Sequence, residues 1–163
     1  MAVINVTSGS QAVLTLGTTD AMSLPGGTNG VIIPLMQDVT VSATTGSVRY
    51  SVLSSPSSSA FTTVNENSVT LNMLLDGDVF FGTATAAGLN TIADKGLLET
   101  SIDKTEIFWS VAFNEGNTTG EYYVKGKGFL TGLTPTSSMD AAIWITPMEI
   151  IVNGEITKVI VTP

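Results

Sequence analysis

The second half of the chain is patterned as β-strands, because large apolar residues recur at every second position. In residues 106–113 the odd-numbered positions are Ile, Trp, Val and Phe, which places them together on one face of a strand. The same alternation runs through residues 121–133 and 139–146, and it occurs earlier in residues 68–75. These four segments are therefore expected to be strands.

Two pairs of shorter segments are predicted to form hairpins. Residues 38–43 and 47–53 alternate β-branched and polar residues on either side of a Thr-Thr-Gly run, which suits a turn. Residues 148–152 and 156–161 flank an Asn-Gly pair, and Asn-Gly favours the type I′ turn that joins antiparallel strands. Each pair is therefore expected to close as a two-stranded unit.

A run of small polar residues separates the strands predicted at 47–53 and 68–75. Residues 54–60 are five serines, a proline and an alanine. Such side chains bury too little apolar area to offset about 1–2 kcal/mol of backbone entropy per ordered residue. We therefore expect residues 54–67 to be a projecting loop that becomes ordered only on a partner. Its expected anchors on that partner are Ser55, Pro56, Phe61 and Val64.

One segment, residues 85–102, has the spacing of an amphipathic helix. Its apolar residues follow one another at helical intervals and share one face, and Thr85 is placed to cap the N-terminus. Gly88 and Gly96 each weaken the helix by about 1 kcal/mol relative to alanine, so it needs a sheet for support. The residues expected to pack on that sheet are Leu89, Ile92, Ala93 and Leu97.

Length and strand content together indicate one mainly β domain. Domains cluster at about 100–150 residues, and this chain has 163. The predicted architecture is a β-sandwich or half-barrel with one flanking α-helix, over residues 1–163. Residues 1–11 and 158–163 are expected to be a flexible N-terminal arm and a C-terminal tail.

The composition adds a prediction of self-assembly, because few residues are charged. Charged side chains make up 12% of the chain, whereas about 25% is typical of a globular domain. The surface must then be rich in hydroxyls and amides, which are less costly to bury against another protein than ions are. We therefore expect a homo-oligomer. Lys125 and Lys127, on one face of a predicted strand, are expected to pair with acidic groups of a neighbouring subunit.

The same composition argues against catalysis and nucleic-acid recognition. The chain has no histidine and no cysteine, so it lacks the commonest general base, the commonest metal ligand and any thiolate. Six basic side chains against 14 acidic ones give a net charge of −8, which disfavours contact with phosphates. We expect no enzyme, no catalytic or cofactor-binding residues, no cofactor and no sequence-specific nucleic-acid binding.

Two short acidic motifs have a chemical interpretation and a plainer structural one. An Asp-Gly-Asp motif at residues 76–78 begins like a calcium loop, but Ala87 stands where the loop needs its twelfth-position Glu. A turn that ends a strand is expected there instead of a metal site. Glu149 and Glu155 could hydrolyse glycosides only across a cleft, and a solvated surface is expected for both.

The chain shows no targeting or membrane-spanning pattern. Its first residues lack a basic cluster followed by an apolar run, and no stretch approaches 18 uninterrupted apolar residues. The sequence therefore predicts neither a secretory signal nor a membrane partner. We expect the chain to be made in the cytoplasm.

The order of elements in residues 68–157 resembles that of the major tail tube proteins of long-tailed bacteriophages. An aromatic strand at 106–113 follows the helix, and residues 126–133 read GKGFLTGL, similar to the family pattern G-x-G-F-L-T-x-L. A small-residue turn and a strand that closes in NGEI, residues 153–156, complete the resemblance. The first 67 residues are similar only in style, as a hairpin with a long polar loop.

This resemblance implies a structural virion protein of the tail, made in the host cytoplasm. Six subunits would form a ring whose strands join in one continuous β-barrel, and stacked rings would form a tube. Genomic DNA would pass through the lumen without sequence-specific binding, and other tail proteins would bind the tube ends. Within such a tube, the loop predicted at residues 54–67 is expected from its own composition, polar with the apolar Phe61 and Val64, to carry the contact between rings. The alternatives are a capsid decoration protein or an Ig-like adhesive module, with an enzyme such as a glycosidase third.

Overall fold

The structure is mainly β, as predicted. It is a computed structural model in which residues 12–25, 29–51, 58–83, 91–113, 120–137 and 143–162 are described. None of the described helices is long and apolar enough to cross a membrane. In chain order the elements are β1 (Val13–Gly17), α1 (Asp20–Ser23), β2 (Val31–Ile32), β3 (Met36–Ser51), β4 (Ser58–Leu74), α2 (Gly77–Phe81), α3 (Ile92–Ile102), β5 (Glu106–Ala112), β6 (Tyr122–Thr131), β7 (Thr136–Ser137), β8 (Trp144–Val152) and β9 (Thr157–Ile160).

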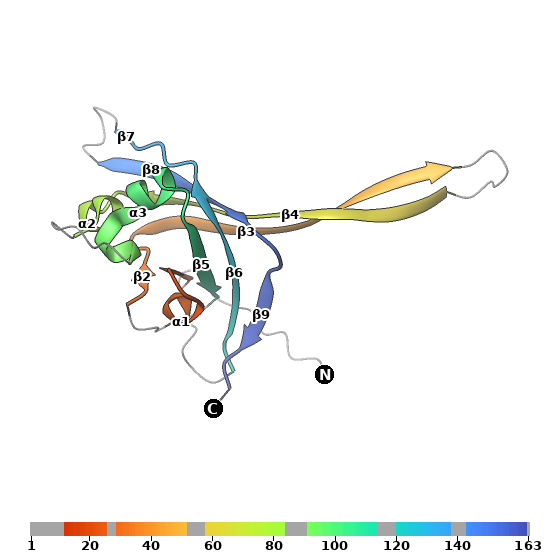
Figure 1. The fold of residues 1–163 in the computed structure, drawn as a ribbon, viewed down its shortest axis with the longest axis horizontal. Helices are drawn as coiled ribbons and strands as arrows, with labels where there is room; N and C mark the ends of the chain where they lie inside the picture. The colour runs from red at the N-terminus through yellow and green to blue at the C-terminus, as the bar shows by residue number, and fades with distance from the viewer. Residues whose placement is uncertain are drawn as a thin grey trace.

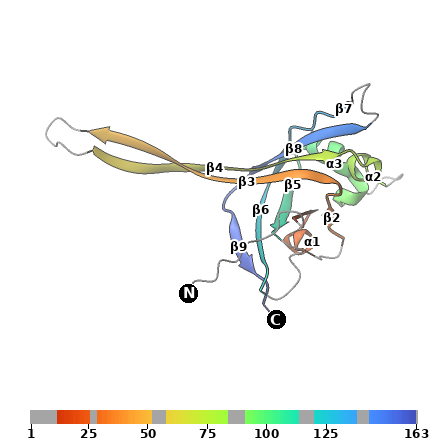
Figure 2. The same cartoon turned by 180° about the vertical axis from the view of Figure 1, so that it is seen from behind.

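All described strands belong to one nine-stranded antiparallel sheet in the order β2-β1-β5-β6-β8-β4-β3. Beside this path β9 pairs with β6 and β7 pairs with β8. The sheet is strongly curved, because β5, β6 and β9 run across the direction of β3 and β4 (Figures 1 and 2). It remains open, with β2 at one end of the order and β3 at the other.

The core lies on one face of this sheet and under the helices. Ile107, Trp109 and Val111 of β5 are almost completely buried, as their alternation predicted. Phe113, the fourth residue of the predicted face, is exposed because β5 ends at Ala112. The other members of the buried cluster are Leu14, Leu16, Val31, Ile33, Val69, Leu71, Met73, Phe80, Ile92, Leu97, Leu130, Met148 and Ile150.

The hairpin predicted around the Asn-Gly pair is wrong. β8 and β9 both pair with β6, β8 up to Val152↔Gly128 and β9 from Thr157↔Lys125, so residues 153–156 are a kink along one side of β6. Gly154 there has a φ of 99°, in the left-handed region that glycine adopts without strain. Because an Asn-Gly pair supplies positive φ for a kink as readily as for a turn, the local sequence could not decide between them.

The hairpin predicted within residues 38–53 is also wrong, because β3 runs unbroken through the Thr-Thr-Gly run for 16 residues. Its partner β4 has 17 residues, so residues 58–67, predicted to be loop, are strand. Thr, Ser and Val suit an extended backbone, and Gly46 lies at a register shift where a β-bulge tolerates it. The chain nevertheless projects here, as a two-stranded extension of the sheet (Figure 1).

The predicted helix is shorter than its sequence pattern. α3 begins at Ile92, and the Thr91 hydroxyl accepts a hydrogen bond from the Asp94 N–H at 3.2 Å, which caps the helix. Thr85, the predicted cap, and Leu89, a predicted core residue, lie outside the described residues.

A kink explains which predicted residues of this helix are buried. Gly96 has a φ of 79°, so the helical face counted from the sequence is not continuous. Ile92 and Leu97 are buried, as predicted, but Ala93 is exposed, contrary to prediction. The absence of a side chain at Gly96 allows close packing on α2, because a Cβ there would clash with the backbone nitrogen of Gly82.

The Asp-Gly-Asp motif begins a helix that the sequence analysis missed. Asp76 is the N-cap of α2, and its carboxylate accepts hydrogen bonds from the N–H groups of Asp78 and Val79 at 3.0 and 3.1 Å. Phe80 of α2 is buried in the core. Together with α3, this short helix covers one end of the sheet (Figure 1).

Candidate assembly interface

The outer part of the β3–β4 hairpin has no third strand beside it. β8 pairs with β4 only between Ser68 and Leu74, and among the described strands none but β3 pairs with residues 58–67. We call residues 43–51 and 58–67 the arm, which extends far from the body in both views (Figures 1 and 2). An isolated two-stranded hairpin is marginally stable at best in water, so a ribbon of this kind would gain stability from contact with a partner.

A β-bulge sets which side chains of the arm face each other. Thr45 pairs with Asn65 but Ser47 pairs with Thr62, so β4 has one residue more than β3 in this interval. An extra residue reverses the alternation of the strand that contains it. Val48 and Phe61 thereby become direct cross-strand partners, and they are 53% and 61% exposed. The arm thus carries an apolar pair on its surface.

β3 also leaves one long edge of the sheet open. Within the part of the chain that the structure describes, β3 pairs only with β4, so the outer backbone groups of this 16-residue strand have no ladder partner. At the other end of the sheet, β2 has only two residues. A long free edge is a template for pairing with another chain. A strand from a second subunit can therefore extend the sheet at β3.

The sheet face that points away from the core carries carboxylates. Glu149 lies between the buried Met148 and Ile150, so alternation directs it to this face, and Thr70 and Thr40 follow opposite it on β4 and β3. By the same register Glu66 and Asp38 lie on this face. We call Asp38, Glu66 and Glu149, with the hydroxyl residues between them, the carboxylate face.

The two lysines of β6 are paired within the chain rather than left for a neighbour. Lys125 Nζ lies 2.6 Å from Asp20 Oδ2 of α1, and Lys127 Nζ lies 3.6 Å from Glu106 Oε1 of β5. The acidic groups of a neighbouring subunit that the sequence analysis predicted as partners are therefore not needed to pair these two lysines. Asp20 is the first residue of α1, which packs on β1 and β5, and this packing brings the acid to Lys125.

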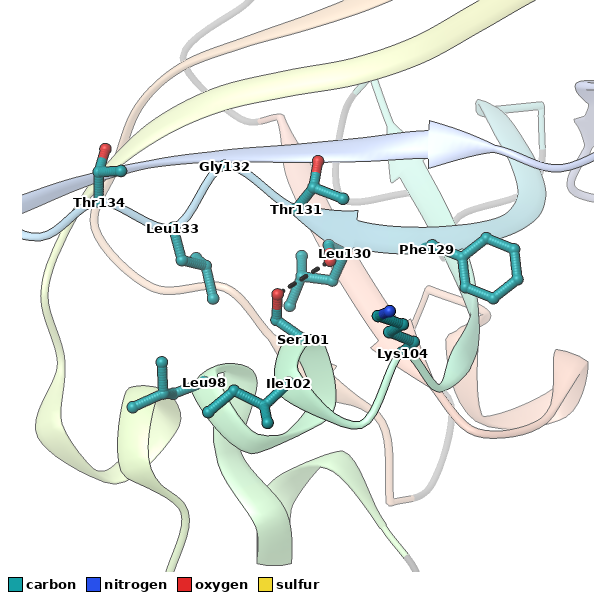
Figure 3. A pocket seen from close by; sticks show the side chains of 10 residues that line it. All are labelled: Leu98, Ser101, Ile102, Lys104, Phe129, Leu130, Thr131, Gly132, Leu133 and Thr134. Atoms are coloured by element: carbon teal, nitrogen blue, oxygen red, sulfur yellow. Dashed lines mark hydrogen bonds between the residues drawn. The ribbon is translucent and has the colours of Figure 1, made fainter.

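An apolar groove separates α3 from the end of β6. Leu98 and Ile102 from the helix and Leu133 beyond the strand lie around it (Figure 3). Ser101 Oγ donates a hydrogen bond to Leu130 O at 3.0 Å and ties the helix to the strand at the base of the groove. The sequence analysis missed this feature, although Leu98 and Ile102 lie four residues apart and so share a helical face.

Of the four contact residues predicted within residues 54–67, the structure describes the side chain of one, Phe61. Phe61 is on β4 and exposed. Val64 is also on β4, but its side chain is not among those described. Ser55 and Pro56 lie outside the described residues. Their role as contacts stays a prediction.

Chemical sites receive no support from the described residues. Among them, no group of three or more Asp, Glu, His or Cys residues is placed to hold a metal ion. Glu149 is on β8 and Glu155 follows it in the kink before β9. The hydrogen bond that Lys95 donates to Asp103 at 2.8 Å raises the pKa of Lys95 above its ordinary value.

No protein-family model matches the sequence, and no curated protein sequence matches it. Solved structures do match. A chain from the tail of an empty gene transfer agent particle with C6 symmetry has a TM-score of 0.60 at 13% identity, over 93% of this chain and 98% of its own. A chain from the virion of the native particle gives 0.61 at 12% identity, over 94% and 99%.

A third similar chain comes from the structure of the sheath/tube terminator of a PVC extracellular contractile injection system in its extended state. Its TM-score is 0.59 at 13% identity, over 97% of this chain and 99% of its own. The likeness spans nearly the whole of each chain, and at this identity it shows the fold. The resemblance to tail tube proteins is thus confirmed at the level of the fold.

Proposed function

We propose that this chain is a structural virion protein that builds the tube of a phage-like tail from stacked six-membered rings. The observation that carries the proposal is the arm, a long two-stranded projection from a body that shares its fold with tail proteins. A projection with an exposed apolar pair and no strand beside it is suited to contact between subunits. The C6 symmetry of one similar tail supports a ring of six.

Ring closure would use the edges of the sheet. An open sheet with a long free edge at β3 can accept a strand from the next subunit, and repeating that step around a ring leaves no edge exposed. The few charged residues of the chain favour such burial, because hydroxyls and amides are less costly to desolvate than ions.

The carboxylate face would line the lumen. Asp38, Glu66 and Glu149 would repel the phosphates of passing DNA, so the genome could slide without binding. With Glu66→Lys and Glu149→Lys together, tubes would retain double-stranded DNA in low salt and release it as salt rises. Tubes of the unaltered chain would retain none.

This role is structural and includes no reaction. The chain would be made in the host cytoplasm and located in the tail of the virion, with other tail proteins at the tube ends. Neither the capsid decoration protein nor the adhesive module gains a specific observation from the described residues.

Negative-stain microscopy of the purified chain at high concentration tests the proposal. We expect six-fold rings or tubes of uniform width. Monomers or trimers that bind only to capsids would instead support the decoration protein, and monomers at every concentration would contradict self-assembly.

A further inference from the structure

We propose that the groove between α3 and the end of β6 receives the arm of a second copy of this chain, with Val48 and Phe61 as the inserted side chains. The inference rests on the proposed function and deepens it by naming the surface that receives the arm.

The groove has the size and lining to take this pair. Its volume is about 630 Å³, within the roughly 300–1,000 Å³ of pockets that bind compact apolar groups. Ile102 at its rim is 68% exposed, the largest exposed fraction among the large apolar residues described. Filling the groove would therefore remove apolar surface of both partners from water.

The charges at the two ends are complementary. The arm carries one positive and one negative side chain, Arg49 and Glu66, and Arg49 is the only charged residue between positions 43 and 65, so the part of the arm farther from the body than Glu66 has a net charge of +1. The segment around the groove is acidic overall, because residues 76–104 hold five carboxylates and two lysines, a net charge of −3, although one of these lysines, Lys104, lines the groove itself. Glu99 is exposed on α3 three residues before Ile102, so it lies on the same side of the helix as this groove residue. Glu99 is therefore the candidate partner of Arg49.

The positions of arm and groove require two copies. The arm lies at one end of the longest axis of the molecule and α3 at the other, so an arm points away from its own groove (Figures 1 and 2). Ten strand residues from 58 to 67 span about 30 Å, whereas a compact chain of this length has a radius of gyration of about 15 Å. The arm is thus long enough to extend over the surface of a neighbouring subunit.

A contact between unlike surfaces is heterologous and repeats without limit unless it closes in a ring. If the arm of each subunit enters a groove in the next ring, every ring carries six arms on one side and six empty grooves on the other. Subunits would then add in one direction, with the same contact at each step.

The natural absence of cysteine gives a direct test. Phe61→Cys and Ile102→Cys in one chain place the only two thiols on the proposed contact. After assembly and treatment with a short thiol cross-linker, we expect a ladder of covalent oligomers that extends beyond six subunits. A ladder that stops at six would still support the arm-in-groove contact but place it within a ring.

Controls separate this inference from the proposed function. Phe61→Cys combined with Thr162→Cys, at the far C-terminal end, should give no ladder. Rings or tubes of the Phe61→Cys/Ile102→Cys variant without a ladder would overturn the groove contact and leave the tube function intact. Failure of the unaltered chain to assemble at all would overturn the tube function itself.

A mixed assembly covers the case in which the double variant does not assemble. Chains with only Phe61→Cys and chains with only Ile102→Cys are mixed with an excess of the unaltered chain, which builds the tube. Covalent pairs that contain one chain of each variant are expected, and their absence from intact tubes would refute the contact.

Discussion

The same two strands pass through two different environments. In the body, Val69 and Leu71 of β4 are buried, and β4 has a neighbour on each side, β3 and β8. From Asn67 toward the tip of the arm the strand has fewer large apolar residues, β8 has ended, and Phe61 is exposed. Burial on a shared core, rather than backbone pairing, is therefore what distinguishes the body from the arm.

This contrast assigns separate tasks to the two regions. Full burial of one large apolar side chain contributes about 1.5–3 kcal/mol, and the described core lies entirely in the body. The arm, a two-stranded ribbon, would obtain its equivalent burial only from another subunit. Substitutions in the body should therefore change folding, and substitutions in the arm should change assembly.

The two tryptophans give the largest expected difference. Trp109 is fully buried against Gly126, whereas Trp144 is half exposed on β8. Trp109→Ala should lower the free energy of unfolding by about 3–5 kcal/mol, and Trp144→Ala should change it by less than about 1 kcal/mol. Urea denaturation of both variants measures this. Equal losses would mean that Trp144 belongs to the core.

A second comparison lies within α3. Leu97 is fully buried and Ile102, five residues later, is mostly exposed. Leu97→Ala should cost about 2–5 kcal/mol of unfolding free energy, and Ile102→Ala about 0.5 kcal/mol or less. Thermal and urea unfolding of the isolated chain report both values. A small effect of Leu97→Ala would show that α3 is not anchored to the sheet.

A third, smaller change in unfolding free energy is expected where the backbones of β6 and β8 approach each other closely at Gly128. A Cβ on Gly128 would meet the Ile151 carbonyl oxygen and the Ile150 side chain, so Gly128→Ala should cost about 1–3 kcal/mol. The matched control is Gly77→Ala at the start of α2, where a Cβ would meet nothing within 4 Å. That change should be neutral or stabilise by about 0.4–1 kcal/mol. A destabilised Gly77→Ala with a normal Gly128→Ala would contradict the register of β6.

The body could be predicted from the sequence to a large extent, because burial imposes alternation. The prediction placed Ile107, Trp109 and Val111 correctly on one buried face of a strand. It also placed Leu97 correctly on the buried face of the helix. Where tertiary contacts override local signals, the prediction was wrong. The Asn-Gly pair was interpreted as a hairpin turn, but β9 pairs with β6, and no local pattern encodes that choice.

The arm and the groove were harder to predict for a different reason. A ribbon that obtains its burial from another molecule needs no alternation of its own, so its polar sequence was interpreted as loop. The bulge that pairs Val48 with Phe61 depends on the register of both strands together. The groove depends on how α3 lies on β6, which the helical spacing of Leu98 and Ile102 suggests but does not determine.

The arm should show the smallest effect on folding and the clearest effect on assembly. Val48→Ser with Phe61→Ser removes the exposed apolar pair, and the unfolding free energy of the isolated chain should change by about 0.5 kcal/mol or less. Rings should no longer stack into tubes, because the arm has lost the side chains that a subunit of the next ring would bury. Denaturation and negative-stain microscopy on the same preparation measure both.

The matched control for this variant is Leu71→Ala, farther along the same strand but inside the body. It should cost about 2–5 kcal/mol while leaving the exposed surface of the arm unchanged, so that whatever protein remains folded still assembles. If instead the arm variant unfolds as readily as Leu71→Ala, the arm is part of the folding unit. If the arm variant forms tubes of normal length and stability, the contact between subunits lies elsewhere, with residues 1–11 and 158–163 as the next segments to test.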